Sequence, residues 1–245
     1  MYGWRARIGF ICPTQTGETF IHEFPMVAPE GVSLMLTTMK IQALTRDNIG
    51  ASLATVQQVT AELAANHADI AILGGSPTIT YGGFGFDQEI IRQMKEVAPN
   101  IPCTTSQTGA VLALRRLGAK KVAIASPFSD HQNDLLKKFL EDSGFQVPST
   151  KGLDVPIQGL GGMASYASYR VAKDAFNQAR DVDAVYMPCA QMPTFKNIAA
   201  LEADLGVPVI SSFQAMLWHV FDLLDIRDPR PGYGSLFDTL NAPRR

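Results

Sequence analysis

Cys189 is the residue whose type and position in this chain point most directly to chemistry. It follows the short apolar segment 184–187, so the pattern predicts that it stands at a turn between a strand and a helix. The N-terminus of a helix lowers the pKa of a nearby thiol, which can then donate a proton to a carbanion or remove one from a carbon acid. The alternative is a buried cysteine that packs as a small hydrophobic side chain.

The two other cysteines are weaker candidates. Cys103 lies in the apolar segment 101–104 and is expected in the core. Cys12 precedes Pro13, which would end a strand, so Cys12 could border a site, although packing is the preferred interpretation. Because the cysteines form no C-x-x-C pair and no histidine spacing typical of zinc accompanies them, we expect no disulfide framework and no metal site.

Glycines and small hydroxyl residues gather where other predicted strands end. Gly75 and Ser76 follow one such strand, and Thr14 follows another. In parallel α/β sheets, ligands bind beyond the carboxyl ends of the strands, where helix N-termini present backbone N–H groups. No arginine, lysine or carboxylate stands at these strand ends, so N–H and hydroxyl groups would hold a substrate carboxylate. The pattern therefore predicts an uncharged cradle for an anion.

The elements that must position these residues alternate in type along the chain. Short apolar runs are separated by longer amphipathic segments, which is typical of an α/β protein with parallel sheets. Strands are predicted over 6–12, 35–43, 69–74, 101–104, 121–125, 148–153, 184–187 and 207–211. Helices are predicted over 48–66, 87–97, 106–117, 130–143, 165–178, 195–205 and 212–224.

The chain also contains a weak internal duplication. Three segments recur in the same order: 7–14 as 121–128, 69–78 as 183–192, and 101–106 as 207–212. Asp69 and Asp183 open the second pair, and hydroxyl residues suited to helix N-capping end the third. The duplication predicts two similar halves that face each other, 1–115 with 216–245 and 116–215. The alternative is reuse of a common strand–turn–helix pattern.

Several motifs resemble a known group of enzymes. Similarity to arylmalonate decarboxylase occurs in segments 102–105, 114–118, 121–125 and 230–238, whereas 189–194 is similar to the second-cysteine motif of maleate isomerases. The chain thus resembles, over nearly its whole length, the aspartate/glutamate racemase superfamily in its branch of arylmalonate decarboxylase and maleate cis-trans isomerase. The resemblance implies two pseudo-symmetric, Rossmann-like halves, each with a four-stranded parallel sheet, and an active site between them.

The resemblance also implies a reaction. Members of this group have two mirror-related strand ends, which correspond here to Gly75 and Cys189. Racemases and maleate isomerases carry a cysteine at both, whereas arylmalonate decarboxylase keeps only the second. The single thiol therefore implies cofactor-free decarboxylation of a small substituted malonate-type dicarboxylic acid, with Cys189 protonating the resulting enediolate on one face.

Substrate contacts are implied, by the same resemblance, at Pro13, Thr14, Ile49, Gly75, Ser76, Phe128 and Ala190. The Ser76 hydroxyl and the backbone N–H groups of Gly75 and Ala190 would hold the anionic carboxylate. At Ile49 and Phe128 the decarboxylase has tyrosines, so two hydroxyl contacts are missing here and the identity of the substrate stays open.

Two other functions stay open as well. If Cys12 supplied a second thiol, the chain could act as an isomerase or racemase of maleate or another small acid. A third interpretation is a non-catalytic protein that binds a small carboxylic acid and has lost the chemistry.

Composition excludes several other classes. The 245 residues are 46% hydrophobic and 18% charged, which excludes a disordered or fibrous chain. A net charge of -2 argues against nucleic acid as a partner. No apolar run reaches the roughly 18 residues of a membrane span, and no signal peptide is recognisable, so a cytoplasmic protein is expected. A homo-oligomer is left open.

Overall fold

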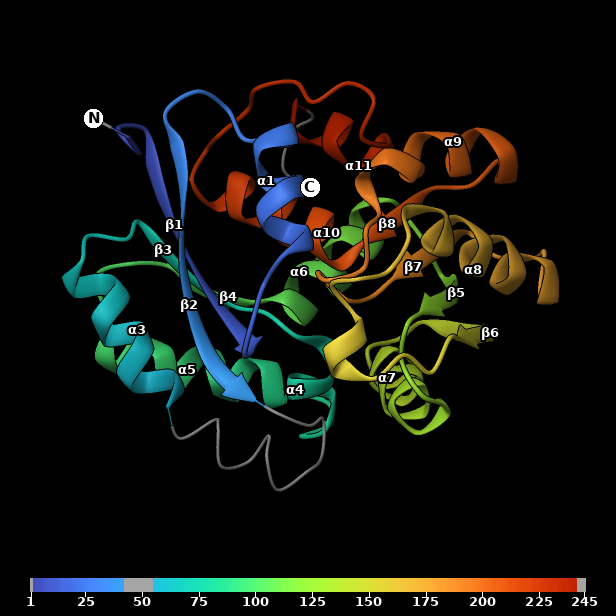
Figure 1. The fold of residues 1–245 in the computed structure, drawn as a ribbon, viewed down its shortest axis with the longest axis horizontal. Helices are drawn as coiled ribbons and strands as arrows, with labels where there is room; N and C mark the ends of the chain where they lie inside the picture. The colour runs from blue at the N-terminus through green and yellow to red at the C-terminus, as the bar shows by residue number, and fades with distance from the viewer. Residues whose placement is uncertain (1, 42–54, 242–245) are drawn as a thin grey trace.

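The computed structural model describes residues 2–41 and 55–241, and these residues build two four-stranded sheets (Figure 1). Every strand pair is parallel, and the strand orders are β2-β1-β3-β4 and β6-β5-β7-β8. The strands are β1 (Ala6–Thr14), β2 (Val32–Ile41), β3 (Ile70–Leu73), β4 (Cys103–Thr105), β5 (Lys121–Ser126), β6 (Gln146–Gly152), β7 (Ala184–Met187) and β8 (Val209–Ser211). The predicted α/β class with two parallel four-stranded halves is confirmed.

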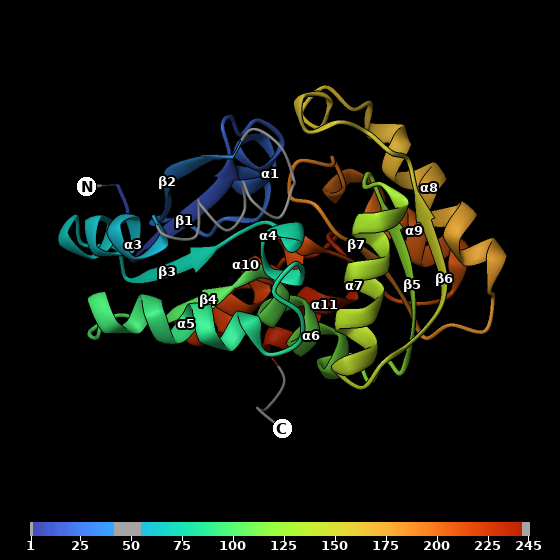
Figure 2. The same ribbon diagram turned by 90° about the horizontal axis from the view of Figure 1, so that it is seen from below.

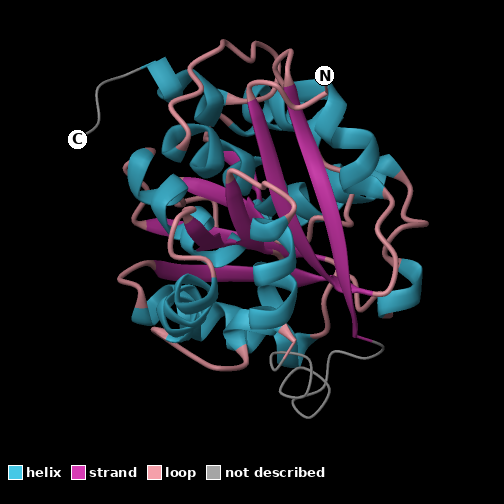
Figure 3. Ribbon diagram, turned by 90° about the vertical axis from the view of Figure 1, so that its left-hand side faces the viewer, coloured by secondary structure: helices cyan, strands magenta, loops and turns pink. Residues whose placement is uncertain are grey.

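Helices cover both sheets. They are α1 (Thr19–Val27), α3 (Val56–Ala65), α4 (Ser76–Thr80), α5 (Phe86–Val97), α6 (Ser106–Arg116), α7 (Asp130–Asp142), α8 (Ser165–Gln178), α9 (Phe195–Leu205), α10 (Ser212–Leu223) and α11 (Ser235–Asp238), with 3-10 turns at Ile157–Gly159 and Thr239–Asn241. Figure 2 shows α7 and α8 on either side of the second sheet. Figure 3 shows that the strands of the two sheets run in different directions. Within residues 2–41 and 55–241, no helix combines the length and apolarity that a membrane crossing requires.

Each predicted strand overlaps a strand of the structure, and the apolar runs of β3 and β7 are buried along their whole length. Of the predicted helix 48–66, residues 48–54 lie outside the described part of the chain. Helices α1, α4 and α11 were not predicted. Helix α1 contains Pro25 and has no side-chain N-cap, and α4 and α11 are only five and four residues long, too short to show a helical periodicity.

The duplicated aspartates make equivalent contacts in the two halves. The Asp69 carboxylate accepts a hydrogen bond from the backbone N–H of Arg7 at 2.7 Å, at the start of β1. The Asp183 carboxylate accepts from the N–H groups of Lys120 and Lys121, both at 2.8 Å, at the start of β5. Each aspartate therefore ties the beginning of the third strand of its half to the beginning of the first.

Replacing Asp183 with alanine is expected to destabilise the fold by about 1 kcal/mol, a value reduced for the exposure of this side chain. The hydrogen bonds from Lys121 and Lys120 hold the pKa of Asp183 below its usual range. The stabilisation of the fold by Asp183 is therefore fully present above the unfolded-state pKa of this carboxyl, and it is lost as the pH falls through the lower, folded-state pKa. Thermal unfolding at pH 7 should show a decrease of about 2–4 °C in Tm.

Asp181 provides the matched control for this experiment. It lies two residues away and pairs with the Lys121 ammonium, but its side chain is 92% exposed. An exposed pair of this kind contributes little, so Asp181→Ala should leave the Tm nearly unchanged. Equal melting temperatures for Asp183→Ala and the unmutated protein would contradict the role of the duplicated aspartate.

The two halves meet along α6 and α10, the helices that follow the fourth strand of each half (Figure 1). Thr105 and Ser211 cap them, each accepting a hydrogen bond from the backbone N–H three residues on, so the predicted hydroxyl N-caps are confirmed. Gly109 permits the close approach of the helices, since a Cβ there would lie 3.3 Å from the carbonyl oxygen of Ala215. The domain boundaries at 115/116 and 215/216 stay a prediction.

Candidate active site

A cavity of about 40 Å³ lies at the carboxyl ends of β1, β3 and β7, where the two halves face each other. Its lining residues are Phe10, Cys12, Pro13, Thr14, Phe20, Gly75, Ser76, Pro77, Thr78, Phe128, Leu160, Cys189, Ala190 and Gln191. The structure thus brings together the predicted site residues of both halves, apart from Ile49, which lies outside the described residues. Their roles in binding and catalysis stay predictions.

Cys189 and Gly75 occupy equivalent turns, directly beyond β7 and β3. Their φ angles are 94° and 88°, so both have a backbone conformation that favours glycine. A residue with a side chain adopts this conformation only at a cost, and such strain concentrates at functional sites. A Cβ at Gly75 would lie 2.4 Å from Cγ of Pro13. Of the two mirror-related positions, only the second therefore presents a side chain to the cavity.

The predicted effect of a helix on the Cys189 thiol is wrong. The next helix, α9, begins only at Phe195, and Cys189 is 7% exposed. Burial raises the pKa of the thiol to about 12, although hydrogen bonds from the backbone N–H groups of Gln191 and Met192 lower it and the nearby Cys12 raises it further. The resting side chain is therefore a neutral thiol, which holds a proton to donate.

Alkylation of Cys189 by iodoacetamide at pH 8 is expected to be at least about ten-fold slower than that of an exposed cysteine, because so little thiolate is present. Peptide mapping by mass spectrometry after timed quenching measures the rate at each cysteine. The protein unfolded in urea serves as the control, since all cysteines should then react alike. Rapid modification of Cys189 in the folded protein would contradict a neutral, buried thiol.

Cys12 both packs in the core and lines the cavity. It is 2% exposed, its sulfur lies 3.1 Å from the Thr14 hydroxyl, and burial raises its pKa. Cys103 is buried at the start of β4 and is not among the cavity-lining residues, as expected for a core position. Cys12 and Cys189 are therefore the two thiols that meet at this site.

Ser76 is held by a chain of hydrogen bonds that crosses between the halves. Its hydroxyl lies 3.5 Å from the hydroxyl of Tyr186 on β7, which in turn donates to Oε1 of Gln107 on α6 at 3.1 Å. Because the Tyr186 proton is directed to Gln107, the tyrosine oxygen can accept from Ser76. The single Ser76 proton then points to Tyr186 in the empty site, and the hydroxyl must rotate to donate it to a bound carboxylate.

Thr78 is a candidate that sequence reasoning did not single out. It lines the cavity, is fully buried, and its hydroxyl has no hydrogen-bond partner among the described residues. An unpaired buried hydroxyl is costly, which suits a group that pairs with a ligand. The sequence feature that could have identified Thr78 is its position two residues after Ser76, in a polar segment that follows a buried strand. The apolar lining residues Phe10, Phe20 and Leu160 had no comparable signal.

Comparison with known proteins agrees with this arrangement. The model of the arylmalonate decarboxylase family matches residues 8–237. The chain belongs to the arylmalonate decarboxylase family. This confirms the resemblance to the aspartate/glutamate racemase-like branch. A crystal structure of a mutant arylmalonate decarboxylase in its liganded form is 26% identical, with a TM-score of 0.89, and the match covers 95% of this chain and 99% of that one.

Curated relatives of this family member include enzymes with two different activities. Arylmalonate decarboxylase of Bordetella bronchiseptica is 28% identical over 239 residues, which cover 94% of this chain and 96% of the relative. Maleate isomerase of Pseudomonas putida is 24% identical over 242 residues, with the same coverage. The relatives are thus enzymes named for decarboxylation of arylmalonates and for isomerisation of maleate.

Proposed function

We propose that this family member is a cofactor-independent decarboxylase of a small substituted malonate-type dicarboxylic acid. The observation that supports this most is the difference between the two equivalent turns: Cys189 presents a thiol to the cavity, whereas Gly75 presents no side chain. A neutral thiol can protonate a carbanion at once, whereas addition to a double bond or abstraction of a proton requires the thiolate.

In the proposed reaction, one substrate carboxylate is held by the Ser76 and Thr78 hydroxyls and by backbone N–H groups at Gly75 and Ala190. The bond from the central carbon to the other carboxylate breaks, CO2 leaves, and the electron pair remains as an enediolate on the held carboxylate. Cys189 then gives its proton to the carbon. The thiolate that remains is stabilised by the N–H groups of Gln191 and Met192 and regains a proton from solvent.

The cavity also favours loss of a carboxylate charge. Its lining includes the side chains of Phe10, Phe20, Phe128 and Leu160, and none of its lining residues is charged. An apolar wall disfavours a carboxylate and favours neutral CO2.

An isomerase of a small acid is the second candidate, because Cys12 lines the same cavity as Cys189. It would need one thiolate as a nucleophile or base, although burial raises the pKa of both thiols. For this reason the decarboxylase is preferred.

Proton NMR in D2O distinguishes these functions. The protein is incubated with a mixture of malonates, maleate and small chiral acids, and the time course is recorded beside measurement of released CO2. We expect a decarboxylated product that carries one deuterium, delivered by the exchanged thiol. Fumarate formed from maleate, or deuterium exchange without CO2, would instead support the isomerase. Binding without any turnover would support a non-catalytic binding protein.

A further inference from the structure

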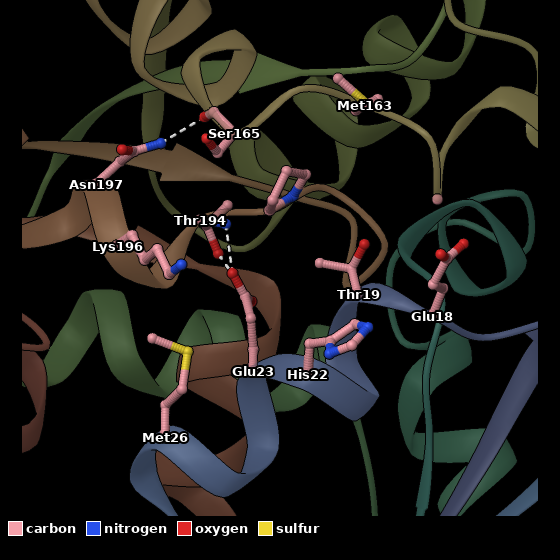
Figure 4. A pocket seen from close by; sticks show the side chains of 12 residues that line it. Glu18, Thr19, His22, Glu23, Met26, Met163, Ser165, Thr194, Lys196 and Asn197 are labelled. Atoms are coloured by element: carbon pink, nitrogen blue, oxygen red, sulfur yellow. Dashed lines mark hydrogen bonds between the residues drawn. The ribbon is translucent and has the colours of Figure 1, made fainter.

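Behind the loop that follows Cys189 lies a second cavity, of about 230 Å³, between α1, the start of α9 and residues 161–165 (Figure 4). Figure 4 shows the Glu23 side chain rising from α1 toward Thr194. Helix α1 belongs to the first half of the molecule and α9 to the second. Glu23 is only 6% exposed although it carries a carboxylate, and a carboxylate is rarely buried unless it has partners.

Those contacts place the Glu23 carboxylate on the N-terminus of α9. One of its oxygens accepts hydrogen bonds from the backbone N–H groups of Thr194, at 2.6 Å, and Phe195, at 2.8 Å; the other lies 3.4 Å from the Thr194 hydroxyl. Thr194 is at the N-cap position but its own side chain makes no capping hydrogen bond. A carboxylate from the other half therefore caps this eleven-residue helix and opposes its dipole.

The same part of the first half also holds Gln191. The Thr19 hydroxyl donates to the carbonyl oxygen of Gln191 at 2.7 Å, and the Gln191 side chain accepts from the N–H of Glu18 and donates to the carbonyl oxygen of Thr16. Gln191 also lines the active-site cavity, and the next residue, Met192, donates its backbone N–H to the carbonyl oxygen of Cys189 at 3.2 Å. Residues 16–23 thus fix both ends of the segment 191–195, which is hydrogen-bonded to the backbone of Cys189.

We propose that Glu23 is a positioning residue: from across the interface between the halves, it holds segment 191–195, and through the hydrogen bond from the Met192 N–H to the Cys189 carbonyl oxygen it keeps the Cys189 thiol directed into the active-site cavity. Its effect on turnover rests on the proposed function, whereas its effect on the thiol does not. Loss of the contact would free the start of α9 and loosen the backbone two to six residues beyond Cys189.

The electrostatic setting supports this role. Burial raises the pKa of Glu23 to about 7, against the hydrogen bonds from Phe195 and Thr194 that lower it. The other ionisable groups that line this cavity are Glu18 and His22 on the α1 side and Lys196 on α9. The ionised Glu23 carboxylate accepts strong hydrogen bonds from the two N–H groups, whereas its protonated form accepts weak ones. Turnover should therefore fall as pH drops through about 7.

Two variants test the proposal, Glu23→Ala and Glu23→Gln, with His22→Gln as the control on the same helix and cavity. Glu23→Ala should lower kcat by about 10- to 100-fold, with a much smaller change in KM, because the thiol is displaced rather than the substrate contacts. Glu23→Gln, which retains one acceptor, should recover part of kcat and lose the inflection near pH 7. His22→Gln should retain the kcat of the unmutated protein and the inflection near pH 7.

Two further measurements separate this proposal from the proposed function. Hydrogen exchange at the Thr194 and Phe195 amides and the alkylation rate of Cys189 should both rise in Glu23→Ala, even if no acid is turned over. If the Thr194 and Phe195 amides exchange faster in Glu23→Ala but the alkylation rate of Cys189 and kcat are unchanged, Glu23 only caps the helix, and the proposal is overturned. If Glu23→Ala does not fold, the pH profile and alkylation rate of Glu23→Gln decide the question: profiles equal to those of the unmutated protein would overturn it.

Discussion

Cys189→Ala is expected to lower the rate of CO2 release from a malonate-type acid by about 10³-fold, within the range typical for loss of a positioned general acid. The alanine removes the thiol proton that Cys189 would give to the carbon, while the cradle for the carboxylate is unchanged. Turnover should therefore be lost with little loss of binding. Steady-state CO2 release and the ligand-induced shift in Tm measure these two effects separately.

The other thiols provide the controls for Cys189→Ala. Cys103→Ala should retain turnover, because Cys103 is not among the cavity-lining residues. Cys12→Ala should also retain decarboxylation, although it removes a thiol from the same cavity. If Cys12→Ala abolished activity as completely as Cys189→Ala, a single proton donor would be contradicted and a two-thiol isomerase supported. Substantial CO2 release by Cys189→Ala would remove the thiol from the mechanism altogether.

Sequence patterns could predict the sheets because the signals that specify them are local. The fully buried strands β3 and β7 are continuous apolar runs, and the aspartates Asp69 and Asp183 that tie the strand starts occur at equivalent places in the repeat. The duplication likewise identifies Gly75 and Cys189 as equivalent. Their nearly equal φ angles show that the repeat extends to the backbone of the turns.

The electrostatics of the site could not be predicted in the same way. The pKa of Cys189 depends chiefly on burial, and part of that burial comes from the other half, where Phe20 and Cys12 line the same cavity. Helix α1, which supplies Phe20 and Glu23, was not predicted because Pro25 and the missing N-cap conceal it. Contacts made between distant segments therefore reversed the direction of the pKa shift expected from the local turn.

Thr78→Val is expected to lower kcat/KM by about 100-fold, the lower end of the range for removal of one donor to a developing oxyanion. Valine is close to threonine in shape, so the cavity keeps its form and loses only a hydroxyl. Because that hydroxyl has no partner among the described residues in the empty site, its removal should not lower the Tm. Steady-state kinetics and thermal unfolding of the same preparation measure both effects.

Thr104→Val is the matched control, and the comparison decides whether the Thr78 hydroxyl acts on substrate. Thr104, in the middle of β4 of the first half, is also buried and its hydroxyl also has no partner among the described residues, but it is not among those that line the cavity. Both variants should therefore fold with unchanged or higher stability, and only Thr78→Val should lose kcat/KM. Equal losses in the two variants would assign the effect to packing of the first half. A lower Tm confined to Thr78→Val would show that its hydroxyl supports the fold rather than the enediolate.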